Sequence, residues 1–177
     1  SSGRKSEHPN FLYQRKKTEM ESRPAERLRA VVDRAAVELL RIFESDASRV
    51  PSPGKWSKKE IIGHLIDSAA NNHGRFVRAQ SSPDLFFDGY DQDEWVRVQR
   101  YGDRPWKDLV ELWQRYNHHI AFLMAGTDET VLARPRSRHS LDTIAFKAVP
   151  STQPVTLEYL MIDYVDHLEH HLRQVFA

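Results

Sequence analysis

The sequence predicts an all-α domain folded as a four-helix bundle with long crossover connections. Four segments carry apolar residues at the spacing of an amphipathic helix, and two long connections between them lack that spacing. The chain has 177 residues, which is enough for one domain with a hydrophobic core and too few for two. Connections of this length also argue against a simple up-down-up-down order of the helices.

The first predicted helix begins at Pro24, because the missing N–H of proline costs nothing in the first turn of a helix. Its apolar residues recur at helical spacing as far as Phe43, and Pro51–Gly54 follows as a helix breaker. Residues 1–23 are charged and weakly patterned. We therefore expect a flexible N-terminal segment ahead of a domain that spans residues 24–177.

The second predicted helix is introduced by Ser57, which with Glu60 forms the sequence signature of a capping box. Apolar residues at helical spacing continue it to about Gln80. The following stretch, residues 84–104, is rich in aromatic residues but has no sustained period. Because connections of this length are often functional, we expect a functional loop with a short helix around residues 93–100.

The third predicted helix covers residues 105–125, with Gly126 as its C-terminal cap. An irregular segment follows over residues 127–154. The last helix is predicted to begin near Thr156, because Thr156 and Glu158 suit a first turn, and to continue almost to the end of the chain.

The composition excludes several classes of site. There is no cysteine, so a metal ion would have to be held by imidazole, carboxylate or water. The formal net charge is +1, which gives no support to a nucleic-acid or acidic-membrane partner. No stretch approaches the roughly 20 apolar residues of a membrane span, and no signal-peptide pattern is visible. We expect a cytoplasmic protein with no nucleic-acid or membrane partner.

The last helix carries a histidine pair, His167 and His171, whose spacing places both imidazoles on one face. Asp163 and Tyr164 lie on the preceding turn of the same side, whereas Glu169 points away and is a poor candidate for a general base. A lone pair of this kind is common on surface helices, so it needs a further ligand to indicate a metal site.

The second helix supplies that further ligand, His64. At about 100° per residue, Asp67, Asn71 and Arg75 share its stripe, and His73 lies on the opposite side. Polar stripes on otherwise apolar helices favour a shared site, because unpaired buried polar groups are costly.

We predict that His64, His167 and His171 hold one divalent metal ion. Three imidazole ligands leave the other positions of the ion open, as in a catalytic site. Asp67 and Asp163 are the candidates for orienting the imidazoles, for ligation or for proton transfer. The alternative is a hydrogen-bonded histidine cluster in a non-catalytic bundle.

Five motifs occur in an order that is similar to a known family: Trp56–Ser57, Gly63–Asp67, Asn72–Phe76, Tyr90–Val96 and Asp163–His171. On these motifs the chain resembles the DinB-like, YfiT-type superfamily of metal-dependent enzymes over about residues 25 to 176. The resemblance implies a four-helix bundle with a long crossover. It also implies that nickel or zinc is bound by His64, His167 and His171, and it suggests a homodimer.

The resemblance further implies a metalloenzyme that acts on a small molecule. Some members of the family resemble S-transferases or isomerases that use a low-molecular-weight thiol as co-substrate, others are labelled hydrolases that activate water, and many have no known activity. Within such a site we expect Arg75 to position an anionic substrate group. Tyr164, together with Tyr90 and Trp95, would form an aromatic wall. A bundle in which the histidine or metal cluster is only structural remains the alternative.

Overall fold

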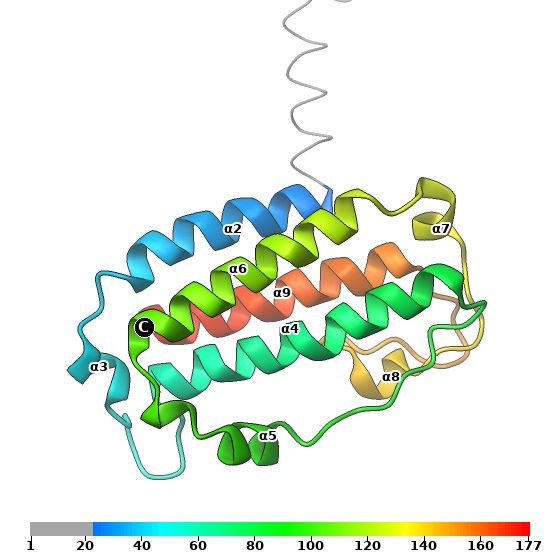
Figure 1. The fold of residues 1–177 in the computed structure, drawn as a ribbon. Helices are drawn as coiled ribbons and strands as arrows, with labels where there is room; N and C mark the ends of the chain where they lie inside the picture. The colour runs from blue at the N-terminus through cyan, green and yellow to red at the C-terminus, as the bar shows by residue number, and fades with distance from the viewer. Residues whose placement is uncertain (1–22) are drawn as a thin grey trace, which may run out of the picture.

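The computed structural model describes residues 23–177, and four long helices dominate it (Figure 1). These are α2 (Pro24–Leu39), α4 (Lys58–Ser81), α6 (Trp106–Ala125) and α9 (Leu157–Phe176). Within the described residues there is no β-strand, only two isolated β-bridges. The all-α bundle predicted from the sequence is confirmed. The expected flexibility of residues 1–23 lies, except for Arg23, outside the described residues.

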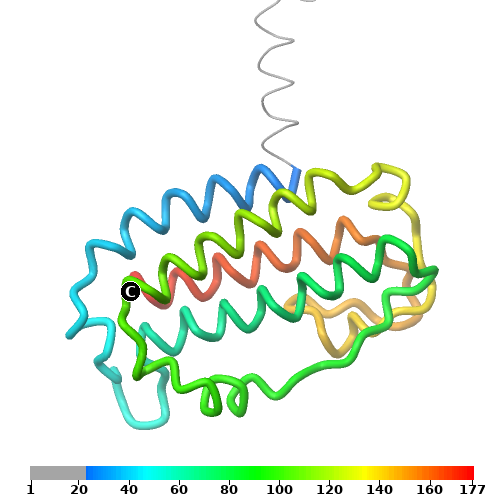
Figure 2. Tube along the Cα trace, viewed as in Figure 1, coloured from blue at the N-terminus to red at the C-terminus, as the bar shows by residue number. Residues whose placement is uncertain are grey.

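The order of the helices in space differs from their order in the chain. Helix α6 packs against α2 and α4, and α9 packs against the same two helices. The tube trace shows α4 and α6 running in one direction and α2 and α9 in the other (Figure 2). Residues 82–105 must therefore return along the whole length of the bundle between α4 and α6. This is the long crossover predicted from the sequence.

Short helices occupy the connections: α3 (Glu44–Ser48), α5 (Gln92–Gln99), the 3₁₀ helix η1 (Tyr101–Asp103), α7 (Glu129–Ala133) and α8 (Leu141–Ile144). Helix α5 confirms the short helix expected in the crossover, and α7 and α8 lie in a segment that was predicted to be irregular. One prediction was wrong. Phe43 was assigned to the inner face of the first helix, but that helix ends at Leu39 and Phe43 is 75% exposed.

The helix ends agree with the capping signals in the sequence. Ser57 and Glu60 form a complete capping box at the start of α4. The side chain of Thr156 accepts a hydrogen bond from the backbone N–H of Tyr159 and so caps α9. Gly126 stands at the C-cap of α6 with a φ of −86°, so its position does not require a glycine.

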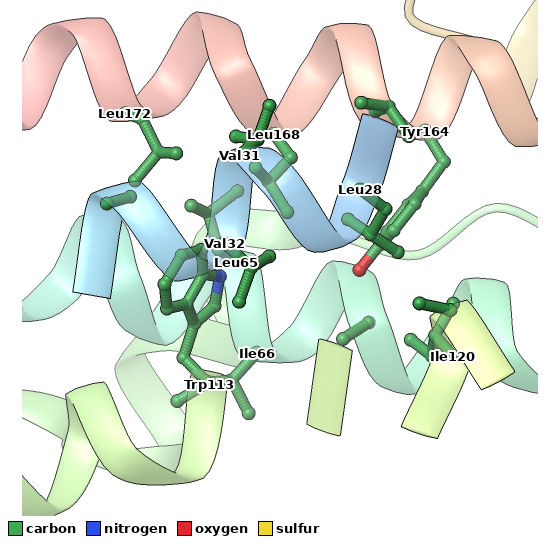
Figure 3. Close-up of a cluster of buried hydrophobic side chains, with 14 of the residues drawn as sticks. Leu28, Val31, Val32, Leu65, Ile66, Trp113, Ile120, Tyr164, Leu168 and Leu172 are labelled. Carbon is green, nitrogen blue, oxygen red and sulfur yellow. The ribbon is translucent and has the colours of Figure 1, made fainter. Parts of the chain in front are cut away.

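All four long helices contribute to one hydrophobic core (Figure 3). Burial of these side chains supplies the main driving force for folding. Figure 3 labels ten residues of this core: Leu28, Val31, Val32, Leu65, Ile66, Trp113, Ile120, Tyr164, Leu168 and Leu172. None of the helices in residues 23–177 combines the length and apolar character that crossing a bilayer requires.

Candidate metal centre

Three imidazoles from two helices meet at one side of the core. His64 comes from α4, and His167 and His171 come from α9. One ligand atom of each lies within 4.8 Å of the others, and the Nε2 atoms of His64 and His167 are 3.2 Å apart. Nitrogen ligands on a tetrahedral zinc ion, at about 2.05 Å from the metal, lie roughly 3.3 Å from one another. The separation of this pair therefore fits a shared divalent ion.

Two polar side chains determine which nitrogen of each α9 histidine is free. The Nδ1 of His171 lies 2.8 Å from Oε1 of Gln174, to which it can donate. The Nδ1 of His167 lies 3.4 Å from the hydroxyl oxygen of Ser68. Contacts at Nδ1 leave Nε2 of each ring available as a ligand, which is the usual arrangement around protein-bound metals.

Burial keeps these imidazoles neutral. Burial, with a smaller contribution from the neighbouring histidines, lowers the pKa of His64 to about 4 and the pKa of His167 to about 3. The pKa of His171 is also lowered, mainly by burial. A neutral imidazole has a lone pair to donate at pH 7, as metal binding requires. The three side chains thus fit a divalent metal in position and in protonation state.

The cluster lies in the wall of an open cavity of about 470 Å³ between α4 and α9. This volume is within the range of small-molecule sites. The two long connections complete the cavity wall, one through Gly89, Tyr90 and Gln92 and the other through residues 143–146. The rings of Trp56 and Phe146 pack at 5.0 Å from His64 and 5.6 Å from His167, respectively, measured between centroids.

Asp67 lies about one turn after His64 on α4, but its side chain bonds to the crossover. Its Oδ1 accepts hydrogen bonds from the Tyr101 hydroxyl, at 2.5 Å, and from Gln99, both in the crossover. Its carboxylate makes no hydrogen bond to an imidazole and does not line the cavity. The prediction that Asp67 orients a histidine or moves protons is therefore not supported; Asp67 holds the crossover against α4.

Asp163 lines the cavity, but its carboxylate is occupied. Its two oxygens accept the backbone N–H groups of Phe146 and Lys147 at 2.8 and 2.7 Å. Neither oxygen contacts an imidazole, so the geometry does not support the expected role of Asp163 as a ligand or orienting group. Its effect on the site is indirect, because it places Phe146 against His167 and His170.

Tyr164 lines the cavity, while its hydroxyl bonds within the core. The hydroxyl donates to Oδ1 of Asn117 at 2.6 Å, and both residues are buried. Complete burial raises the pKa of Tyr164 well above its usual range. Tyr164 is thus a wall residue, and its phenol is not placed to transfer protons.

The structure also corrects the composition of the polar stripe. Arg75 is buried and lines the cavity, as expected. Asn71 does not line the cavity, because its amide bonds back to the Asp67 carbonyl, and Asn72 lines it instead. Trp95 packs on Tyr90 without reaching the cavity wall.

Several residues of the site were not predicted from the sequence, among them Trp56, Ser68, Asn72, Phe146, His170 and Gln174. Ser68 and Gln174 had a detectable signal, since each lies within one helical turn of the expected polar face. Trp56 and Phe146 had none, because they belong to connections without a period.

A helical bundle with an open site of three histidines defines a class of candidate metalloproteins, and comparison with known proteins agrees. The family model of the DinB superfamily matches residues 25–175, and the chain belongs to this superfamily. A solved structure, YfiT from Bacillus subtilis, is similar in fold, with a TM-score of 0.65 and 19% sequence identity. The match covers 99% of this chain and 90% of YfiT, which is described as a probable metal-dependent hydrolase with an unusual four-helix bundle topology. The comparison with curated proteins found no match.

Proposed function

We propose that this protein is a metal-dependent hydrolase of a small molecule, with a divalent ion held by His64, His167 and His171. One observation carries the proposal: three neutral imidazoles converge on the wall of an open cavity of substrate size. In a closed structural site, protein groups would occupy all coordination positions of the ion, and no cavity would adjoin it. The description of YfiT as a probable metal-dependent hydrolase supports the same reaction class.

A bound divalent ion supplies Lewis acidity, which brings the pKa of water or a thiol toward neutrality. The protein's own side chains bind and orient the substrate. Trp56 and Phe146 provide apolar walls on either side of the cluster. Burial raises the pKa of Tyr90 to about 12, so this phenol is a neutral hydrogen-bond donor in the cavity.

Hydrolysis also requires movement of a proton. The water oxygen forms a bond to the electrophilic carbon of the substrate, the bond to the leaving group breaks, and the leaving group takes up the proton of the water. His170 lines the cavity next to His171 and is outside the proposed ligand set. We assign the proton transfer to His170, because Asp67 is not part of the cavity wall, the Asp163 carboxylate accepts two backbone N–H groups, and the Tyr164 hydroxyl donates to Asn117.

Thiol transfer is the second candidate, with nickel or zinc as the ion in either case. The chain contains no cysteine, so a thiol would have to enter the cavity as a low-molecular-weight co-substrate. The sulfur would then bond to the electrophilic carbon in place of the water oxygen, the bond to the leaving group would break, and the leaving group would take up the thiol proton. We further propose that the protein is a homodimer, that its substrate is a small molecule and that it acts in the cytoplasm.

Elemental analysis of untagged protein tests the metal assignment. Wild type reconstituted with nickel, zinc or manganese should retain one ion per chain after desalting, and His64→Ala should retain less than a tenth of that amount. His119→Ala is the matched control, because His119 is exposed on α6, packs its ring on that of His73 and is not part of the cavity wall. Absence of stoichiometric metal in the wild type under all three conditions would refute the proposal.

Activity and stability together separate the candidate functions. A hydrolase should cleave activated esters or amides without added thiol, whereas a transferase should consume an electrophile only when a thiol is present. A structural site should show neither reaction, and metal loss in His167→Ala should then cause a large fall in Tm. For an enzyme we expect a modest fall in Tm and complete loss of turnover.

A further inference from the structure

Arg75 is a buried positive charge with no carboxylate partner among residues 23–177. The residue is only 4% exposed. Its Nη2 donates to the backbone carbonyl of Asp88 at 2.8 Å, and its Nη1 donates to Oδ1 of Asn72 at 3.4 Å. Both acceptors are neutral. Burying a charge in this way is costly unless a counter-ion compensates it.

The guanidinium also has unused donors. A guanidinium carries five N–H groups in a rigid fork, and the described part of the chain accepts from two of its nitrogens. Burial lowers the pKa of Arg75, yet a guanidinium remains charged at any pH of interest. Because Arg75 lines the cavity, a molecule in the cavity can reach the remaining donors.

The rest of the cavity wall does not supply the missing negative charge. The one carboxylate in the wall, that of Asp163, is bonded to two backbone N–H groups. Tyr90 is a neutral phenol at neutral pH, and burial keeps His64 and His167 neutral. The cavity thus offers one uncompensated positive charge, beside an amide and a phenol.

We propose that Arg75 is the receptor for a carboxylate group of the substrate, bound through two parallel N–H···O bonds. A carboxylate carries one negative charge and matches the planar fork of a single guanidinium. A dianionic phosphate would leave a second negative charge buried without a partner. The inference rests on the proposed function only in taking this cavity as the substrate site.

The positions of Arg75 and of the histidine cluster in the cavity also constrain the shape of the substrate. Arg75 follows His64 by 11 residues on the same helix, which separates their backbones by about 16 Å along its axis, and its side chain reaches back by one turn to Asn72. The substrate class is therefore a carboxylic acid derivative whose reacting group stands apart from its carboxylate. Its carboxylate lies at the Arg75 end of the cavity, and its hydrolysable or electrophilic group lies at the histidine end.

Binding of a simple carboxylate to metal-free protein tests this inference directly. Sodium butanoate is titrated into wild type, with butanamide as the neutral isostere and inorganic phosphate as the competing anion, and the Arg75 Nε–H resonance is followed by NMR. We expect butanoate to shift this resonance, and butanamide to leave it unchanged. Phosphate should bind more weakly than butanoate.

Variants assign the effect to the guanidinium. Arg75→Gln should weaken butanoate binding about 10- to 100-fold, and Arg75→Lys should fall between it and wild type. Arg78→Gln is the matched control, because Arg78 is exposed one turn further along α4 and outside the cavity wall. Should Arg75→Gln fail to fold, the wild-type titration and Arg75→Lys still decide the result. Unchanged affinity in Arg75→Lys, absence of the NMR shift, or tighter binding of phosphate would each overturn the inference.

A His64→Ala arm separates this inference from the metal proposal. Butanoate affinity of metal-free His64→Ala should equal that of metal-free wild type if Arg75 is the receptor. If butanoate binds only to metal-loaded protein and its affinity is the same in Arg75→Lys, the carboxylate binds to the metal. That result would overturn the inference and leave the metal proposal standing. If the wild type retains no metal after reconstitution but still binds butanoate through Arg75, the inference stands and the metal proposal fails.

Discussion

The Nε2 atoms of His64 and His167 lie 3.2 Å apart, although 103 residues separate the two histidines in the chain. Helices α4 and α9 run in opposite directions and pack side by side, which brings the early turns of one to the late turns of the other. This contact sets the geometry on which the metal proposal depends.

Gln174 should determine metal affinity through His171. Its Oε1 accepts from Nδ1 of His171, and removing such an outer partner typically reduces metal affinity about 10- to 100-fold. We expect this loss in Gln174→Leu, measured by competition with a chromophoric chelator. Gln174→Glu retains an acceptor and should bind at least as tightly as wild type. Equal affinities in all three proteins would rule out an orienting role.

The stability of the metal-free protein should fall as the pH decreases below 6.5. The pKa of His64 is lowered to about 4 and that of His167 to about 3, from 6.5 in the unfolded chain. The folded state therefore holds fewer protons than the unfolded state in this window, and the free energy of unfolding decreases as pH falls through it. Above pH 6.5 these two groups contribute no pH dependence.

Urea unfolding at pH 7.5, 6.5, 5.5 and 5.0 measures this effect. Each histidine contributes at most about 1.4 kcal/mol per pH unit. The double variant His64→Ala/His167→Ala should show a flatter profile than wild type over the same range. A wild-type stability that stays constant down to pH 5 would contradict the burial of neutral imidazoles.

Gly63→Ala should destabilise the protein, although alanine is the better helix former. An added Cβ would lie 2.1 Å from the ring of Tyr101, which packs directly on Gly63. Displacing that ring breaks the Tyr101 hydrogen bond to Asp67 and releases the crossover. Overpacking of this kind costs about 1–3 kcal/mol, measured here as a decrease in Tm.

Gly74→Ala in the same helix is the control for Gly63→Ala. Its Cβ would meet only the flexible side chain of Arg78, at 3.2 Å. The usual gain of up to about 1 kcal/mol for alanine over glycine in a helix should then appear, with a small rise in Tm. If both variants change Tm in the same direction, the contact between Gly63 and Tyr101 does not control stability.

Asp163→Ala should loosen the segment around Phe146 without removing the metal. Asp163 holds this segment through two backbone N–H groups. We expect faster limited proteolysis within residues 142–150 and unchanged metal stoichiometry. Asp142→Ala, an exposed change in α8, should leave the digestion rate as in wild type. Loss of metal from Asp163→Ala together with an unchanged digestion pattern would instead make Asp163 a ligand.

Apolar periodicity and capping signals in the sequence predict the four long helices, the starts of α4 and α9 and the grouping of the three histidines. Ser57 with Glu60 specifies the start of α4, and the spacing of His167 and His171 places both on one face of α9. These are local relationships that follow from 3.6 residues per turn.

Tertiary packing, in contrast, determines which partner each polar atom bonds. Asp67 and Asp163 share helix faces with the histidines, yet their carboxylates bond to the crossover and to residues 146–147. Helical periodicity cannot predict these partners, because they come from connections that have no period and are positioned by packing. The same reason explains why Phe146 was missed and why Arg75 emerged as an unpaired charge in the cavity wall.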